Sequence, residues 1–136
     1  MKRISVEIKS IKKNYSLVES LLYKANEEFL MPESEFCNVM IAASEIIMNA
    51  MVHGNRESGE KKIRVTVEYD KDVMKIKILD EGSWLKHVKD LNPKLPEDMM
   101  KISGRGIFIV KSLVDGVEYR DTGEGTEFTL IVRKKK

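Results

Sequence analysis

The chain has 136 residues, of which 42% are hydrophobic and 34% are charged, so residues 1–136 are expected to form one globular domain rather than a disordered chain. The single cysteine argues against an internal disulfide, and the two histidines argue against a multi-histidine metal centre. The N-terminus has no apolar stretch, which argues against a signal peptide, and no run of roughly 20 apolar residues occurs, which argues against a membrane protein. Together these features favour a cytoplasmic location. The net charge is +2, but the tail 133–136 supplies four positive charges and the remainder is −2, which argues against nucleic-acid binding.

The first part of the chain predicts one strand and two helices. Residues 2–9 alternate, with Ile4, Val6 and Ile8 on one face, which is typical of a half-buried strand. Residues 11–30 carry apolar side chains at spacings of three and four, which predicts an amphipathic helix that Pro32 ends. A second helix is expected from about residue 34 to residue 52, with Gly54 as its C-cap.

The second part predicts two hairpins separated by a long loop and a helix. Residues 61–69 and 73–79 alternate on either side of a turn at residues 70–72. Residues 81–103 are expected to form a loop, a length that is usually functional, and residues 104–114 a helix. Residues 117–120 and 127–133 predict a closing hairpin. The expected fold class is α+β: a two-layer sandwich of a mixed, mostly antiparallel sheet with helices on one face.

The second helix carries the most informative pattern. Its apolar residues cover most of the helix circumference, and Ile41, Met48 and Met51 extend the main apolar stripe on one side, so we expect burial on more than one side. A narrow polar strip remains, which consists of Glu45, Asn49 and His53. The strip is either a solvent-facing seam or a site, in which a Glu acts as general base and an Asn carbonyl binds Mg²⁺.

Three further segments are candidate site elements. Asp80-Glu81-Gly82 follows a strand and could accept a hydrogen bond from a ligand amine, although such a sequence is usually a turn. Ser103-Gly104-Arg105-Gly106 opens a helix and suits a phosphate, or is a plain helix start. Gly123-Glu124-Gly125-Thr126 is first of all a hairpin turn.

Together these segments resemble the GHKL ATPase superfamily. Residues 45–54 are similar to its N box, Asp80-x-Gly82 to its G1 box, Gly104-Arg105-Gly106 to its G2 box and Gly125-Thr126 to its final G box. The resemblance covers nearly the whole chain, with the four boxes in the family's order. Within the superfamily the chain looks most like the stand-alone anti-sigma-factor serine/threonine kinases, whose G2 wording is close to residues 103–110.

The resemblance implies a Bergerat-type nucleotide fold that uses ATP and Mg²⁺. It implies that Glu45 is the catalytic base and that Asn49 holds the Mg²⁺ that bridges the phosphates. It also implies that Asp80 binds the adenine amine and that Gly82 leaves room beside the base. The remaining implied ATP-binding residues are His53 in the N box, Gly104, Arg105 and Gly106 near the phosphates, and Thr126 near the adenine.

The same resemblance implies partners. The family phosphorylates a small anti-anti-sigma (STAS-type) protein, binds a sigma factor and forms a homodimer. One position departs from the family, because Trp84 stands where the second glycine of the G1 box belongs. Three alternatives stay open: a nucleotide-responsive binding module without catalysis, a kinase of another partner-switching pathway, and a nucleic-acid binder that uses the basic tail.

Overall fold

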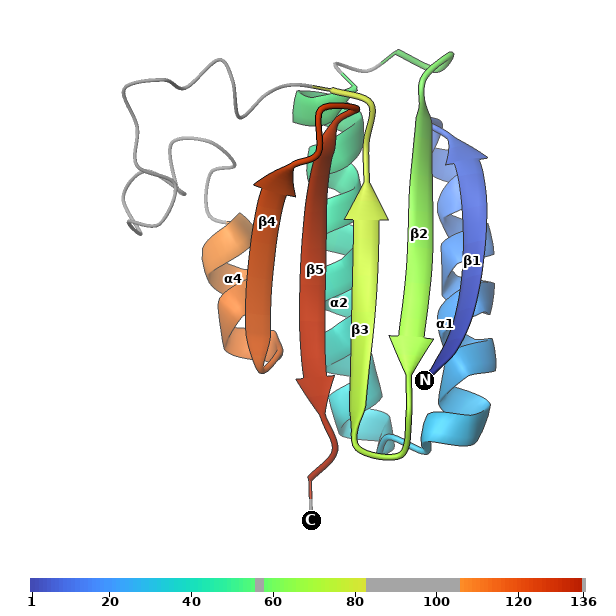
Figure 1. The fold of residues 1–136 in the computed structure, drawn as a ribbon, viewed down its shortest axis with the longest axis vertical. Coiled ribbons are helices and arrows are strands. Elements are labelled where there is room, and N and C mark those ends of the chain that lie inside the picture. Colours follow the sequence, from blue (N-terminus) through green and yellow to red (C-terminus); the bar gives the residue numbers. More distant parts are fainter. Residues whose placement is uncertain (56–57, 83–105, 136) are drawn as a thin grey trace.

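The computed structural model describes residues 1–55, 58–82 and 106–135 (Figure 1). Its strands are β1 (Lys2–Lys9), β2 (Lys62–Tyr69), β3 (Val73–Leu79), β4 (Gly116–Asp121) and β5 (Thr126–Arg133). Its helices are α1 (Tyr15–Phe29), α2 (Glu33–Asn49) and α4 (Gly106–Leu113), with a 3-10 turn (Lys12–Asn14) before α1 and a π-helical turn (Ala50–Gly54) after α2. The predicted strands and helices are therefore present, in the predicted order.

The five strands form one sheet in the order β1-β2-β3-β5-β4. All four of these strand pairings are antiparallel, so the sheet is more uniform than the mixed sheet that the sequence led us to expect. Helices α1, α2 and α4 all lie behind the sheet in Figure 1, and the other face is open. The predicted α+β two-layer sandwich is confirmed.

The core lies between the sheet and the helices. Every second side chain of the three central strands points inward, as the alternation predicted. The buried residues of these strands include Ile63, Val65 and Val67 in β2, Met74, Ile76 and Ile78 in β3, and Phe128, Leu130 and Val132 in β5. Val18 and Leu22 of α1 and Ile46 and Ile47 of α2 are among the helix residues buried with them. Because each large side chain contributes about 1.5–3 kcal/mol on burial, this core fixes α2 over the sheet.

The open face of the sheet carries cross-strand ion pairs. Arg3 lies opposite Glu68 in the β1–β2 register, and the Glu68 carboxylate also pairs with Lys77 on β3 (N–O distances 2.7 and 2.6 Å). The hydrogen bonds from Lys77 and Arg3 lower the pKa of Glu68 to about 2. Arg64 pairs in the same way with Glu7. The outward side chains of neighbouring strands therefore satisfy one another's charge.

The α1–α2 connection is tight, and α2 is a core helix. α1 ends at Phe29, where Leu30 adopts a left-handed conformation (φ 59°), and Pro32 immediately precedes α2. One described helical stretch, Glu33–Val52, is long and apolar enough to cross a membrane by length and composition alone. Half of that stretch is buried within the domain, as is usual for the central helix of a globular core.

Candidate active site

The polar strip of α2 is turned partly inward. Asn49 is only 8% exposed, and its amide nitrogen has no hydrogen-bond partner in the described part of the chain. Glu45, one turn earlier, is half-buried, and no ion pair or hydrogen bond to it is seen among the described residues. His53 lies in the π-helical turn, and its side chain is outside the described residues. A buried amide without a partner is costly, so Asn49 is poised to bind something outside the described chain.

The side of α2 that faces solvent is apolar, which corrects one expectation. Ile41 is 49% exposed, Met48 36% and Val52 37%; of the three residues expected to widen the buried stripe, only Met51 is buried, at 3%. These exposed residues share one helix face, since they are seven and four positions apart. Glu45 lies four positions after Ile41 and three before Met48, so it borders this exposed face, whereas Asn49 is turned into the domain.

Asp80 and Thr126 form a second group on the helix side of the sheet. Asp80 continues the inward-facing series that runs through Ile78 of β3, and it is 1% exposed. One oxygen of its carboxylate accepts hydrogen bonds from the backbone N–H groups of Gly82 (2.9 Å) and Thr126 (3.1 Å). The Asp80 N–H donates to the Thr126 carbonyl (3.0 Å), and Thr126 is also 1% exposed. The structure thus brings together three predicted site residues from two distant segments.

Gly125 makes this contact possible; the sequence placed it in the final G box but gave it no role of its own. A Cβ atom at Gly125 would lie 1.7 Å from the backbone oxygen of Asp80. Gly123, in the same turn, has open space around it but a left-handed backbone (φ 87°). Two glycines of one turn are thus required for different reasons: Gly123 for conformation and Gly125 for the close approach of two strands. The G-x-G spacing was the available signal, although it does not distinguish these roles.

The two groups lie at the same end of the domain. Figure 1 shows the end of α2, the end of β3 and the start of β5 together at the top of the view. α4 begins at Gly106 and packs beside α2. The other two residues of that predicted phosphate segment, Gly104 and Arg105, lie outside the described residues, as does Trp84. The structure thus brings the predicted N, G1 and final G boxes to one end, on the helix side.

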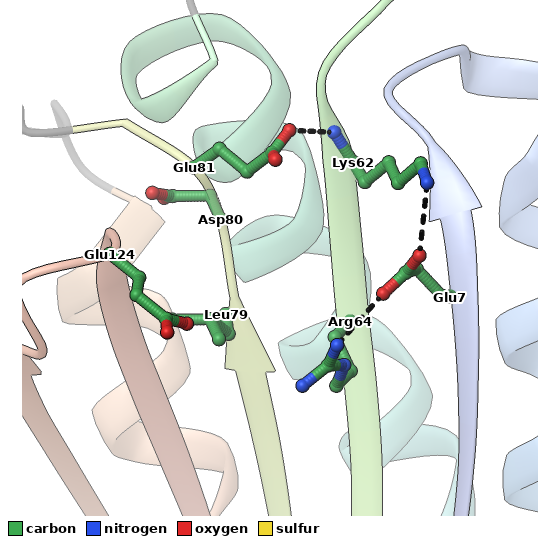
Figure 2. A pocket seen from close by; sticks show the side chains of 7 residues that line it. All are labelled: Glu7, Lys62, Arg64, Leu79, Asp80, Glu81 and Glu124. Carbon is green, nitrogen blue, oxygen red and sulfur yellow. Dashed lines mark hydrogen bonds and ion pairs between the residues drawn. The ribbon is translucent and has the colours of Figure 1, made fainter.

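A hollow of about 480 Å³ lies on the opposite, open face of the sheet. Figure 2 shows its lining residues, among them Lys62, Arg64, Glu7 and Glu81, and their contacts with one another. Glu7 pairs with both Arg64 (3.0 Å) and Lys62 (3.4 Å), so these charges are already satisfied. Asp80 also lines this hollow, at its edge. Because Asp80 continues the inward-facing series of β3 and bonds to the backbone of Thr126, we place the candidate site on the helix side.

The donor set on the helix side fits a nucleotide with a divalent cation. The side-chain oxygen of Asn49 is a hard ligand of the kind that Mg²⁺ prefers. Asn49 is 8% exposed, and its amide nitrogen, which cannot bind a cation, has no partner among the described residues. Among the described residues, no three His, Cys, Asp or Glu side chains gather in a way that could hold a metal ion. The amide of Asn49 is therefore the described group on which a cation site would rest.

Comparison with known proteins identifies the family. Residues 10–132 match the family described as the histidine kinase-like ATPase domain. The serine-protein kinase RsbW of Listeria innocua is 31% identical over 108 residues, which cover 73% of this chain and 68% of that protein. The anti-sigma F factor of Clostridium beijerinckii is 28% identical over 105 residues, which cover 74% of this chain and 71% of that protein.

A solved structure supports the fold. The crystal structure of the RsbU and RsbW domains of a Mycobacterium tuberculosis protein matches with a TM-score of 0.70 and 18% identity. The match covers 98% of this chain and 32% of that one, so the chain spans about a third of the solved protein.

Since the family match spans most of its length, the chain belongs to the histidine kinase-like ATPase family. Within that family it falls among the anti-sigma serine/threonine kinases, as the G2 wording of residues 103–110 predicted.

Proposed function

We propose that residues 1–136 form one ATP-binding kinase domain of a cytoplasmic anti-sigma factor. It transfers phosphate from ATP to a serine or threonine of a small anti-anti-sigma protein of the STAS type, and it sequesters a sigma factor. The observation that carries the proposal is the buried side chain of Asn49, whose amide nitrogen has no partner among the described residues, at the end of the domain where Asp80 meets Thr126. The names of the relatives, a serine-protein kinase and an anti-sigma F factor, support it.

The proposed nucleotide site divides into a base end and a phosphate end. At the base end, Asp80 accepts a hydrogen bond from the adenine amine, Gly82 leaves room for the base and Thr126 lies beside it. At the phosphate end, Asn49 holds Mg²⁺, which neutralises charge on the phosphates when it is bound. His53, Gly104, Arg105 and Gly106 contact the nucleotide near the phosphates. The short hydrogen bonds between Asp80 and Thr126 support the base end, because they hold its two sides together.

In the proposed reaction Glu45 is the general base. Its carboxylate takes the proton of the acceptor hydroxyl while the hydroxyl oxygen bonds to the γ-phosphorus, and the bond from that phosphorus to the β–γ bridging oxygen breaks, so that ADP leaves. The half-buried position of Glu45, one turn from Asn49, supports this role. A base at this place would meet an acceptor that approaches the phosphate end of the site.

The test compares Glu45→Gln with Glu35→Gln. Glu35 is also half-buried on α2 but lies at the other end of the helix, so it is a matched control. Each protein is incubated with Mg-ATP and a purified STAS-type protein of the same organism, and the acceptor's mass is followed. We expect the acceptor to gain the mass of one phosphate with the wild type and with Glu35→Gln, but not with Glu45→Gln, which still binds nucleotide. Undiminished transfer by Glu45→Gln would exclude the proposed base.

The proposed partners need separate tests. Sigma-factor binding is measured by co-elution of the chain with candidate sigma factors in the presence of ATP or ADP. The proposed homodimer is measured by light scattering of the purified chain. Co-elution with no sigma factor would leave a kinase of another partner-switching pathway, and a monomer mass at all concentrations would contradict the dimer.

One feature of the sequence favours a second candidate, a nucleotide-responsive binding module with little or no catalysis. Trp84 replaces the second glycine of the G1 box. In that case ATP would change the affinity for the partner, but the partner's mass would stay the same with the wild-type chain.

A further inference from the structure

The ladder between β2 and β3 stops short at the end that carries Asp80. The last ladder pair there is Arg64 with Leu79. In the same register Lys62 would face Glu81, and their backbone groups would bond to each other if the ladder continued. Instead, the Lys62 N–H donates to the side-chain carboxylate of Glu81 (2.5 Å), a contact drawn in Figure 2. The two strands are thus joined differently beyond this point.

The side-chain amide of Asn55 occupies the place of the missing ladder pair. Its oxygen accepts the Glu81 N–H (2.9 Å), and its nitrogen donates to the Lys62 carbonyl (3.1 Å). These are the backbone groups that an extended ladder would have paired with each other. We call this arrangement, in which Asn55 links Lys62 to Glu81, the Asn55 bridge. A side-chain amide suits this place because it accepts through its oxygen and donates through its nitrogen.

The Asn55 bridge is also attached to the helix that carries Asn49. Asn55 follows the π-helical turn, and its N–H donates to the Ala50 carbonyl (2.7 Å). Asn55 is fully buried, so its two side-chain hydrogen bonds are shielded from water. One residue therefore connects three segments: its backbone N–H bonds to the turn that follows α2, and its side chain joins the start of β2 to the residues that follow β3.

We propose that Asn55 is a positioning residue that sets the place of Asp80 and Gly82 relative to α2, and through it the selectivity of the site for the adenine amine. This inference rests on the proposed function. The segment 80–82 is held on one side by Thr126 on β5 and on the other by the Asn55 bridge. Loss of the Asn55 bridge removes one of these two attachments of the segment 80–82. The Asp80 carboxylate would then no longer be held at one distance from the adenine base.

The test measures the preference for ATP over inosine triphosphate, in which an oxygen replaces the adenine amine. Both nucleotides compete with a fluorescent ADP analogue on the wild type, Asn55→Ala and Asn55→Asp. The Asp variant keeps the acceptor for Glu81 but loses the donor to Lys62. We expect the wild type to prefer ATP and the preference to fall about fivefold in both variants, the factor of roughly one net hydrogen bond.

Asn26→Ala is the matched control. The Asn26 side chain also makes two bonds to backbone, with the N–H (2.8 Å) and the carbonyl (3.4 Å) of Met31. Asn26 lies in α1, and Met31 lies in the α1–α2 connection. This variant should lose thermal stability and keep the wild-type preference for ATP. All proteins are compared at temperatures at which they are fully folded. A loss of stability alone then does not alter the ratio of the affinities for ATP and inosine triphosphate.

The outcomes separate this inference from the proposed function. If the wild type prefers ATP and the Asn55 variants lose stability but keep the full preference, the positioning role is wrong and the nucleotide site stands. If the wild type binds neither nucleotide, the proposed function fails and the inference with it. If both Asn55 variants fail to fold, Asn55→Gln decides: it keeps the amide but moves it by one methylene group away from the Glu81 N–H and the Lys62 carbonyl, and a preference equal to the wild type would overturn the inference.

Discussion

An aspartate lies next to each end of β3, but the two aspartates have different structural surroundings. At the hairpin end Asp70 precedes the strand, and its carboxylate accepts the backbone N–H groups of Asp72 (2.8 Å) and Val73 (2.9 Å). At the other end Asp80 follows the strand, and its carboxylate accepts the N–H groups of Gly82 and Thr126. Asp70 is exposed and bonds only within its own turn, whereas Asp80 is 1% exposed and bonds to a residue 46 positions away.

This difference shows what turns a common aspartate turn into a site. The carboxylate chemistry is the same at both ends. At the hairpin end the β2–β3 ladder continues up to the turn, with Tyr69 and Met74 as its last pair, and the turn only connects the two strands. At the Asp80 end the ladder stops early, Asn55 stands between the strands, and Gly125 lets β5 approach. Long-range contacts, rather than the local motif, distinguish the two ends.

The largest effect is expected from Gly125→Ala, which attacks the Asp80 end directly. A Cβ atom 1.7 Å from the Asp80 carbonyl oxygen forces two backbones apart, at a cost of about 2–4 kcal/mol in the free energy of unfolding. Nucleotide binding should be lost with it. Denaturant unfolding measures the first effect, and titration with a fluorescent ADP analogue measures the second.

Gly123→Ala is the control for Gly125→Ala. It lies in the same turn with open space around it, so only its left-handed backbone is penalised, by about 1 kcal/mol. If the two variants lost equal stability, the close approach at Gly125 would not be the cause.

A smaller effect, but a more specific one, is expected from Asp80→Asn compared with Asp70→Asn. At Asp80 the substitution replaces one of two carboxylate oxygens by an N–H₂ group, which cannot accept the adenine amine. We expect at least about a tenfold loss of ATP affinity, which corresponds to roughly 1.4 kcal/mol. Asp70→Asn should leave ATP affinity unchanged. Competition titrations measure the ATP affinity of both variants. Equal ATP affinities would show that the aspartates at the two ends of β3 do not differ in nucleotide binding.

The smallest expected effect is a loss of stability at acidic pH, and it involves carboxylates near the hairpin end of β3. The pKa of Glu68 is lowered to about 2 by hydrogen bonds from Lys77 and Arg3, and the pKa of Asp70 is lowered by bonds from the backbone of Asp72 and Val73. A lowered folded-state pKa stabilises the fold above the carboxyl's ordinary pKa, and this contribution is lost as the pH falls toward the folded value. Stability should therefore decline between about pH 4.5 and pH 2.

The double variant Glu68→Gln, Asp70→Asn tests this prediction. Its free energy of unfolding should be slightly lower than that of the wild type at pH 7 and should fall less between pH 7 and pH 3. Parallel declines of the two proteins would show that other carboxylates control the acid response.

Much of the fold could be predicted because its signals are local. The alternation of residues 2–9 predicted β1 with the bounds that the structure shows, and Pro32 marked the break between the two long helices. The order of the four boxes predicted the family, which the comparisons confirmed. These features depend on residues close together in sequence or on fixed motifs.

The rest depends on contacts that no local pattern contains. Ile41 and Met48 were expected to be buried because helix periodicity shows which residues share a face, but not whether a neighbour covers it. The role of Asn55 was missed because its partners, Lys62 and Glu81, become neighbours only in the folded sheet. Gly54 was expected as the cap, but the π-helical turn ends there and Asn55 takes the cap position.

The most direct test of the nucleotide site is a binding titration on Asn49→Ala with Asn38→Ala as control. Asn38 is an exposed residue of the same helix. A fluorescent ADP analogue is titrated with and without Mg²⁺ and then displaced with ATP. We predict that the wild type and Asn38→Ala bind the analogue more tightly with Mg²⁺ and release it to ATP, whereas Asn49→Ala binds weakly and no longer responds to Mg²⁺. Absence of binding by the wild type, or the same Mg²⁺ response in all three proteins, would contradict the assignment of this end of the domain to a magnesium nucleotide.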